Sequence, residues 1–311
     1  MLKRVFLSLT FLCIGLNLFS QKKVAITIDD VPNTRKFHQD NFQSVLLNKL
    51  DTLNIPVAIF INEGHLYQTD SVTRNFVLLN DWIKRTYVTP GNHTFAHSNY
   101  SKVGIDSFKI DITKGERNIK EMAHFYNKPI TQFRFPFNSL GNDSVQHYKI
   151  EQFLSKSNYD ITPFTIESAD WMFNSTYKHY LDEGKDKEAK EVAHSYIALT
   201  LDLFDYFDSL SLVHHKRNIN HIYLCHDNEI NADYLDLLVT ELRKRKYSFI
   251  SLNDALRDPI YESKIHYFNA GGISWYYRWI KNEKERNKIM KVEPFNMTFY
   301  RKYKAIKKAK E

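Results

Sequence analysis

Cysteine, glycine and proline are all scarce in this sequence of 311 residues. There are 2 cysteines, 9 glycines and 8 prolines, and no segment repeats along the chain. So few cysteines exclude a disulfide-stapled miniprotein, and no proline- or glycine-rich linker separates domains. Apolar residues at 43% and charged residues at 25% exclude a disordered or fibrous chain. The simplest interpretation is one domain of about 250 residues followed by a basic tail.

Long apolar runs are absent except at the N-terminus. Lys3 and Arg4 precede a mostly apolar run that ends at Ser20, a small residue suited to cleavage. This pattern is typical of an export signal over residues 1–20. An uncleaved anchor stays an alternative, because Leu18 stands where a small residue is preferred. No second apolar stretch approaches 18 residues, so we expect a mature protein without a membrane span, exported to the periplasm, cell envelope or medium.

The net positive charge comes from the end of the chain. The net charge is +7, and residues 281–311 hold 11 basic and 4 acidic residues, which accounts for all of it. A nucleic-acid-binding domain would carry its basic face on the fold itself, so we expect no nucleic-acid partner. The tail is either a solvated helix or a contact for an anionic polymer or a membrane surface.

Short apolar, β-branched runs alternate with helical patterns along the rest of the chain. The expected strands are Val24–Ile28, Val57–Ile61, Tyr87–Thr89, Gln132–Phe135, Tyr159–Thr165, His221–Cys225 and Tyr247–Ser251. The expected helices are Asn41–Leu53, Val72–Lys84, Asp106–Tyr126, Val145–Ser155, Lys187–Leu210 and Ala232–Lys244. This alternation predicts an α/β fold, a distorted (β/α) barrel with about seven parallel strands.

Reactive side chains lie at or after the ends of the expected strands. They are Asp29, Asp30, His93, His97, Arg134, Asp170 and His226. In parallel α/β folds the carboxyl ends of the strands meet at one mouth, where sites are built. We therefore expect these residues, far apart in sequence, to share one cavity.

Two of these groups suggest a metal site. The spacing of His93 and His97 places both imidazoles on one face of a helical turn, as two metal ligands require, although a chance pair is common among 13 histidines. Adjacent carboxylates such as Asp29 and Asp30 are often only a turn or helix cap. In the functional interpretation Asp30 binds the metal with the histidines and Asp29 acts as a base. Two histidines and one carboxylate leave an open coordination position, which is typical of a catalytic site.

Five short motifs in order along residues 24–226 resemble those of the polysaccharide deacetylases, the NodB homology domain of carbohydrate esterase family 4. The motifs are Thr27–Asp30, His93–His97, Arg134–Phe137, Asp170–Trp171 and Leu224–His226. Each motif is common by itself, but the ordered set is specific. The sequence departs from the family pattern at Val31 and Pro32, where glycine is usual, at Phe137 in place of tyrosine, and at Glu167 in place of aspartate.

The resemblance implies a NodB-type catalytic domain over residues 21–258 and a helical basic extension over residues 259–311. It implies a divalent metal, Zn²⁺ in our prediction, on Asp30, His93 and His97. The implied catalytic roles are base for Asp29, oriented by Arg134, and general acid for His226, held by Asp170. The implied substrate contacts are Phe137, whose backbone N–H would stabilise the oxyanion, Trp171 and Leu224.

The leading functional hypothesis is removal of acetyl groups from an N-acetylated, chitin- or peptidoglycan-like glycan. One alternative is an O-acetyl esterase acting on a xylan-type polymer. Another is a catalytically silent sugar-binding protein on the same fold. Asp29 and His226 favour an enzyme, because a pure binder needs neither a base nor an acid. The polymer, the preferred metal and the oligomeric state stay open.

Overall fold

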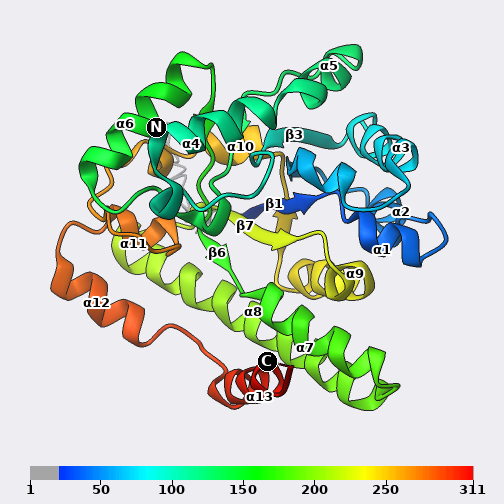
Figure 1. Cartoon of the computed structure of the whole chain (residues 1–311). Coiled ribbons are helices and arrows are strands. Elements are labelled where there is room, and N and C mark those ends of the chain that lie inside the picture. Colours follow the sequence, from blue (N-terminus) through cyan, green and yellow to red (C-terminus); the bar gives the residue numbers. More distant parts are fainter. Residues whose placement is uncertain (1–20, 311) are drawn as a thin grey trace, which may run out of the picture.

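A curled parallel sheet forms the centre of the molecule (Figure 1). The computed structural model describes residues 21–310. Along the sheet the strand order is β5-β4-β3-β2-β1-β7-β6, and β8 pairs with β1 beside this path. All of these pairings are parallel. The predicted distorted (β/α) barrel of about seven parallel strands is confirmed, and it stays open because no pairing among the described residues joins β5 to β6.

The strands are short, and helices connect them. The strands are β1 (Lys22–Val31), β2 (Val57–Ile61), β3 (Val88–Asn92), β4 (Gln132–Phe133), β5 (Asp160–Ile161), β6 (Ile166–Glu167), β7 (Asn220–His226) and β8 (Tyr247–Phe249). The α-helices are α1 (Thr34–Gln39), α2 (Val45–Leu53), α3 (Val72–Ile83), α4 (Tyr100–Lys114), α5 (Arg117–Phe125), α6 (Ser144–Lys156), α7 (Asp170–Asp182), α8 (Asp186–His215), α9 (Glu229–Lys244), α10 (Leu252–Leu256), α11 (Trp275–Trp279), α12 (Glu283–Lys291) and α13 (Met297–Lys310). Three 3₁₀ turns complete the set: η1 (Glu63–Tyr67), η2 (Pro136–Asn138) and η3 (Pro259–Glu262).

Most of the predicted strands and helices are present, with three corrections. The single helix expected over Asp106–Tyr126 is wrong, because two helices, α4 and α5, divide this stretch. The strand β2 has the predicted bounds. The strand β1 extends the predicted run by two or three residues at each end, and β7 by one residue at each end. The single strand expected over Tyr159–Thr165 is wrong, because only Asp160–Ile161 and Ile166–Glu167 pair, each with a different neighbour. The helix α7 was not predicted. The expected export signal, residues 1–20, lies outside the described residues.

The strands separate two apolar clusters. Side chains alternate across a strand, so residues two apart share a face. In β7, Tyr223 and Cys225 belong to the large cluster covered by helices, whereas Ile222 and Leu224 belong to a smaller cluster on the other face. His226 continues the second series. Its side chain is therefore placed at the top of the inner face of the curled sheet.

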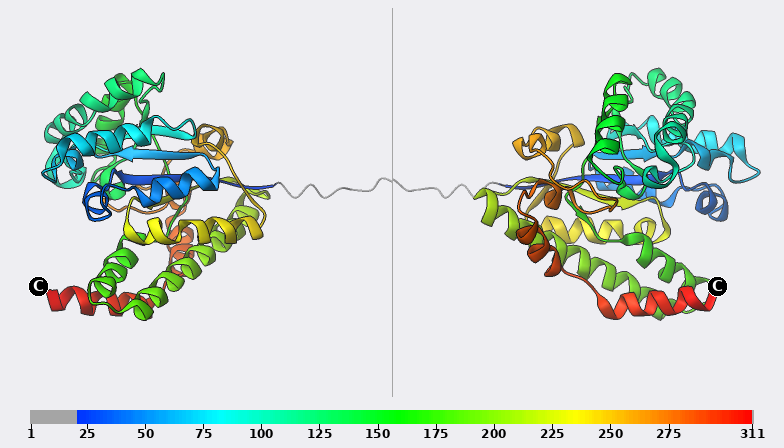
Figure 2. Two further views of the ribbon diagram at one scale, coloured as in Figure 1. Left: turned by 90° about the vertical axis from the view of Figure 1, so that its right-hand side faces the viewer. Right: turned by 60° about the vertical axis from the view of Figure 1, so that its left-hand side comes forward.

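The chain beyond residue 258 wraps back over the barrel. In both views of Figure 2 the helix α13 runs below the sheet, and its C-terminal end projects on the side toward which the strands point. Within residues 21–310, no helix is long and apolar enough to cross a membrane.

Candidate active site

The end of β1 carries two neighbouring carboxylates that reach one cavity. Neighbouring side chains of a regular strand point to opposite faces, but the pairing of β1 with β2 is interrupted between Ile28 and Val31. Asp30 lies in this irregularity with a φ of 62°. A bulge of this kind re-aims a side chain, and both Asp29 and Asp30 line the cavity.

His93 and His97 follow β3 in an irregular loop. The predicted helical turn is wrong, because the helix α4 begins only at Tyr100. Buried polar groups hold the loop instead. The Asp111 carboxylate accepts the backbone N–H groups of Ala96 at 2.7 Å and Ser98 at 3.1 Å. This scaffold brings the two imidazole centroids within 5.0 Å of each other.

Asp30, His93 and His97 converge in a triad that could hold a metal ion. His93 Nε2 lies 3.7 Å and His97 Nε2 lies 3.3 Å from Asp30 Oδ1, and one ligand atom from each residue lies within 4.8 Å of the others. Asp30 Oδ1 is buried and accepts no hydrogen bond within the described residues. His93 Nδ1 donates to the Arg134 carbonyl at 2.7 Å, which leaves Nε2 for a ligand. The residues therefore fit a divalent cation.

Asp29 lies beside the triad but is held differently. Its side chain is buried, Oδ2 lies 3.7 Å from Arg134 Nη1, and Oδ1 has no hydrogen-bond partner among the described residues. Burial raises the pKa of Asp29 to about 6, although the Arg134 guanidinium opposes this. Such a carboxylate is mostly ionised at pH 7 and is basic enough to accept a proton.

The register of the sheet places His226 next to Asp29. The two residues are direct partners in the β1–β7 ladder. His226 Nδ1 donates to Asp170 Oδ1 at 2.6 Å, and its backbone N–H donates to Asp170 Oδ2 at 2.9 Å. Burial alone would lower the pKa of His226, but the charge and hydrogen bond of Asp170 outweigh it and raise that pKa to about 10. His226 is therefore an imidazolium at neutral pH.

These groups line one cavity of about 610 Å³. Its wall also includes Phe137, with a φ of 58° and its ring 4.6 Å from that of His97. Trp171 lies at the rim with half of its surface exposed. Glu167 lies in the wall, and burial together with the Asp170 charge raises its pKa to about 7.

Three of the predicted site residues do not line this cavity: Arg134, Asp170 and Leu224. Asp170 lies behind His226, to which it is hydrogen-bonded. Arg134 lies behind the cavity, fully buried, where Nη2 donates to Thr27 Oγ1 at 3.2 Å and Nη1 faces Asp29. Leu224 is also fully buried and packs in the inner apolar cluster. Because Leu224 is two residues before His226 on the same face of β7, it lies one layer deeper in the barrel.

The sequence analysis missed several polar residues around the site. Asn228 and Asn231 both donate to Asp170 Oδ2, at 3.0 and 2.6 Å. Their place in the first turn of a helix right after His226 is the signal that could have found them. Gly272 reaches the cavity from the C-terminal extension, where a Cβ would come within 2.5 Å of the Phe137 carbonyl oxygen. No local pattern predicts that contact.

Comparison with known proteins finds a family match over the N-terminal half of the chain. Residues 17–154 match the family model described as Polysaccharide deacetylase. The predicted resemblance to the polysaccharide deacetylases of NodB type is confirmed over this region. The matched region contains Asp29, Asp30, His93, His97 and Arg134, whereas Asp170 and His226 lie beyond it.

Similar proteins include a peptidoglycan-N-acetylglucosamine deacetylase from Bacillus cereus, 22% identical over 153 residues. The match covers 49% of this chain and 48% of the relative, so the chain spans about half the length of the curated relative it matches. A solved peptidoglycan N-acetylglucosamine deacetylase is 17% identical with a TM-score of 0.49, over 76% of this chain and 89% of the other. A family pseudoenzyme from Bacillus anthracis is 15% identical with a TM-score of 0.48, over 76% and 66%.

Proposed function

We propose that this protein is a divalent-metal-dependent deacetylase that removes acetyl groups from an N-acetylated glycan. The observation that carries the proposal is the arrangement of one cavity, where a metal triad, a base-like carboxylate and an imidazolium lie together. Asp29 and His226 face each other in the sheet register beside Asp30 and the two histidines. The names of the relatives support an N-acetylglucosamine-containing substrate.

Asp30, His93 and His97 would hold the metal. Burial lowers the pKa of His93 well below its usual value and also lowers that of His97, so both rings can offer neutral nitrogens. Two imidazoles and one carboxylate suit Zn²⁺ at a catalytic site, and we propose zinc. When bound, the cation supplies Lewis acidity at this end of the cavity.

Asp29 would act as the general base. Its unpartnered Oδ1 is free to take a proton from the water that attacks the acetyl carbonyl carbon. Arg134 orients this carboxylate from behind, at 3.7 Å. Because Arg134 is itself buried and anchored on Thr27 and the Pro163 carbonyl, the Asp29 side chain has little freedom to turn away.

His226 would act as the general acid. Asp170 accepts the Nδ1 proton, so the proton on Nε2 is the one available to the leaving amine. Amide cleavage needs this proton, because an amine anion is a very poor leaving group. The Phe137 N–H stands at the start of a 3₁₀ turn, where a backbone donor has no partner within the turn, and it would stabilise the oxyanion.

Trp171 would position the sugar. Its ring is half exposed at the rim of the cavity, and a flat ring suits the apolar face of a pyranose.

The backbone of Gly272 lies in the cavity wall close to Phe137, so the extension over residues 259–311 contributes to the site. We propose that residues 21–258 form the catalytic domain and that residues 259–311 are its extension. We also propose that residues 1–20 direct export to the compartment of the glycan.

The experiment is acetate release by the zinc-loaded full chain, with amine formation measured in parallel. The substrates are N-acetylglucosamine oligomers, peptidoglycan and acetylated xylan, and Asp29→Asn is the matched inactive control. Acetate and amine in equal amounts from an N-acetylated substrate support the proposal. Release from xylan alone would assign an O-acetyl esterase. Binding of all three glycans without release from any would assign a sugar-binding protein.

A further inference from the structure

The helix α13 presents exposed cations that have no carboxylate partner. It contains no acidic residue, and Arg301, Lys304, Lys307 and Lys308 are all exposed. None of these four, which we call the basic edge, forms an ion pair with a carboxylate of the described residues. Lysines near a helix C-terminus also interact favourably with the helix dipole, so their presence alone does not indicate a partner.

The packing of α13 places this basic edge beside the candidate active site. The Phe299 ring stacks on Phe173 of α7 at 3.8 Å, with 7° between the planes. One turn further along, Tyr303 contacts Trp171 edge-on at 6.0 Å. Trp171 lines the catalytic cavity, so α13 directly contacts a residue of the proposed sugar-binding surface.

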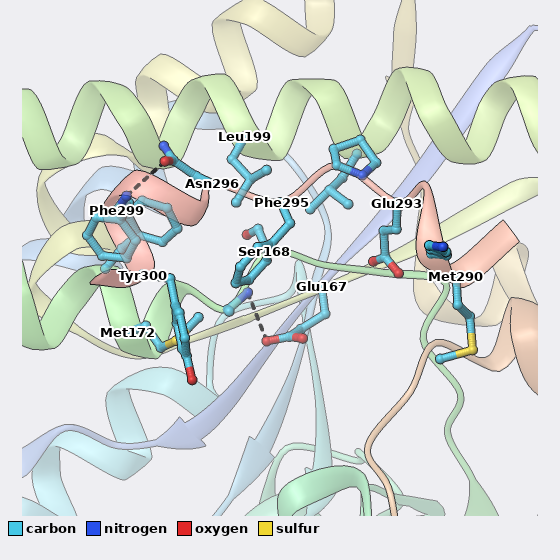
Figure 3. Close-up of a pocket in the computed structure, with 15 residues that line it drawn as sticks. Glu167, Ser168, Met172, Leu199, Met290, Glu293, Phe295, Asn296, Phe299 and Tyr300 are labelled. Atoms are coloured by element: carbon cyan, nitrogen blue, oxygen red, sulfur yellow. Dashed lines mark hydrogen bonds between the residues drawn. The ribbon is translucent and has the colours of Figure 1, made fainter. Parts of the chain in front are cut away.

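The segment before the basic edge is seated in a second cavity of about 340 Å³. Figure 3 shows Phe299 and Tyr300 close to Met172 of α7, with Phe295 near the middle of the lining residues. Glu167 belongs to the walls of both this cavity and the catalytic one. In both views of Figure 2, the free end of α13 projects on the side where the strands end, which is the side of the catalytic mouth.

We propose that the basic edge is a docking surface for an anionic glycan strand, which it guides toward the catalytic cavity. This rests on the proposed function. A helix of 14 residues is about 21 Å long, so it can contact several sugar units of one strand. Exposed cations without partners attract carboxylate or phosphate groups over roughly 10 Å at moderate salt.

The packing favours a glycan over a membrane. A helix that lies on a bilayer must bury an apolar face in it. The apolar face of α13 is already covered, because Phe299 is 5% exposed and packed against α7. Met297 at the start of the helix is half exposed, but the exposed residues from Arg301 onward are alanines and the cations of the basic edge, which suit a hydrated polyanion.

The test is co-sedimentation of full-chain variants with insoluble peptidoglycan, whose peptide stems carry carboxylates, and with neutral chitin. All variants carry Asp29→Asn, so that no turnover changes the polymer. The test variant is Lys304→Gln/Lys307→Gln/Lys308→Gln. The matched control, Lys102→Gln/Lys149→Gln/Lys156→Gln, removes three exposed lysines from α4 and α6, across the molecule from α13.

We expect the test variant to bind peptidoglycan about tenfold more weakly, since three exposed charge pairs are lost. The control should bind like its parent, and chitin binding should be equal in all three. The difference between variants should shrink when NaCl is raised. Equal peptidoglycan binding by test and control variants would overturn the proposal. So would equal loss on chitin, or binding to phosphatidylglycerol vesicles without binding to peptidoglycan. Absence of acetate release by the wild type would contradict the proposed deacetylation but not this docking.

Discussion

Replacing Asp170 by asparagine should leave the candidate general acid as a neutral imidazole, which is a much weaker acid than the imidazolium. Asp170 is fully buried, and its Oδ2 accepts three donors, from the His226 backbone, Asn228 and Asn231. Its Oδ1 accepts only His226 Nδ1. An asparagine has the same shape, and its side-chain oxygen must take the place of Oδ2 to accept the same three donors. Its NH₂ group then faces His226 Nδ1 and donates to it. Because Nδ1 must accept this hydrogen bond, it cannot carry a proton of its own.

The size of the effect follows from the His226 pKa. With Asp170 present this pKa is about 10, so nearly every ring is protonated at pH 7. Without the carboxylate, the two largest contributions that raise this pKa are lost, whereas burial still lowers it. The amide N–H that faces Nδ1 further opposes protonation, so the imidazolium needed as the acid is lost at pH 7. A positioned acid contributes about 10²- to 10⁴-fold, so Asp170→Asn should lose about 10²-fold or more in amide cleavage.

The assay compares two substrates and two variants. N-deacetylation needs a proton on the leaving amine, whereas an activated aryl acetate leaves without one. Asp170→Asn and His226→Ala should both slow N-deacetylation by about 10²-fold or more, and slow the activated ester much less. Thermal melts detect loss of the fold. Equal rate losses on both substrates with unchanged melting temperatures would refute the acid role of His226.

Three further predictions concern the rest of the molecule. Gly115→Ala should weaken metal binding in equilibrium dialysis without touching a ligand, because its Cβ would lie 2.4 Å from the Thr94 carbonyl carbon in the histidine loop; unchanged affinity would contradict this. Asp29→Asn should retain the metal and lose most acetate release, since it removes a base but no ligand; metal loss would reverse the assigned roles. Burial alone would raise the pKa of Asp208, but hydrogen bonds from His221, Lys22 and Tyr247 outweigh burial and lower that pKa. This stabilisation exists above about pH 4 and is lost as the pH falls further. The melting-temperature gap between wild type and Asp208→Asn should therefore be constant above about pH 5 and narrow below pH 4; a gap that widens would be inconsistent.

The sequence predicts the strands well where burial alone decides them. The run Val57–Ile61 is apolar on both faces, and it is a strand with these bounds because helices and the barrel interior cover both sides. The helix α7 escaped prediction because its 13 residues include many polar ones and its packing comes from tertiary contacts. Phe173 illustrates this, since it is buried against Phe299, which is 126 residues away in sequence.

The candidate site was predictable as a set of residues but not as a geometry. Strand ends meet at one edge by topology, which is why Asp29 and His226 come together. The loop of His93 and His97 is different. Its shape depends on hydrogen bonds from Asn62 and Asp111, and no local spacing rule contains those contacts.

The central claim is a single divalent cation held by Asp30, His93 and His97 beside an independent base. Zinc stoichiometry after equilibrium dialysis of the purified wild type, His97→Ala and Asp29→Asn tests it directly. We predict about one zinc per chain in the wild type and in Asp29→Asn, and far less in His97→Ala. Equal zinc in all three proteins, or loss from Asp29→Asn as complete as from His97→Ala, would contradict the account.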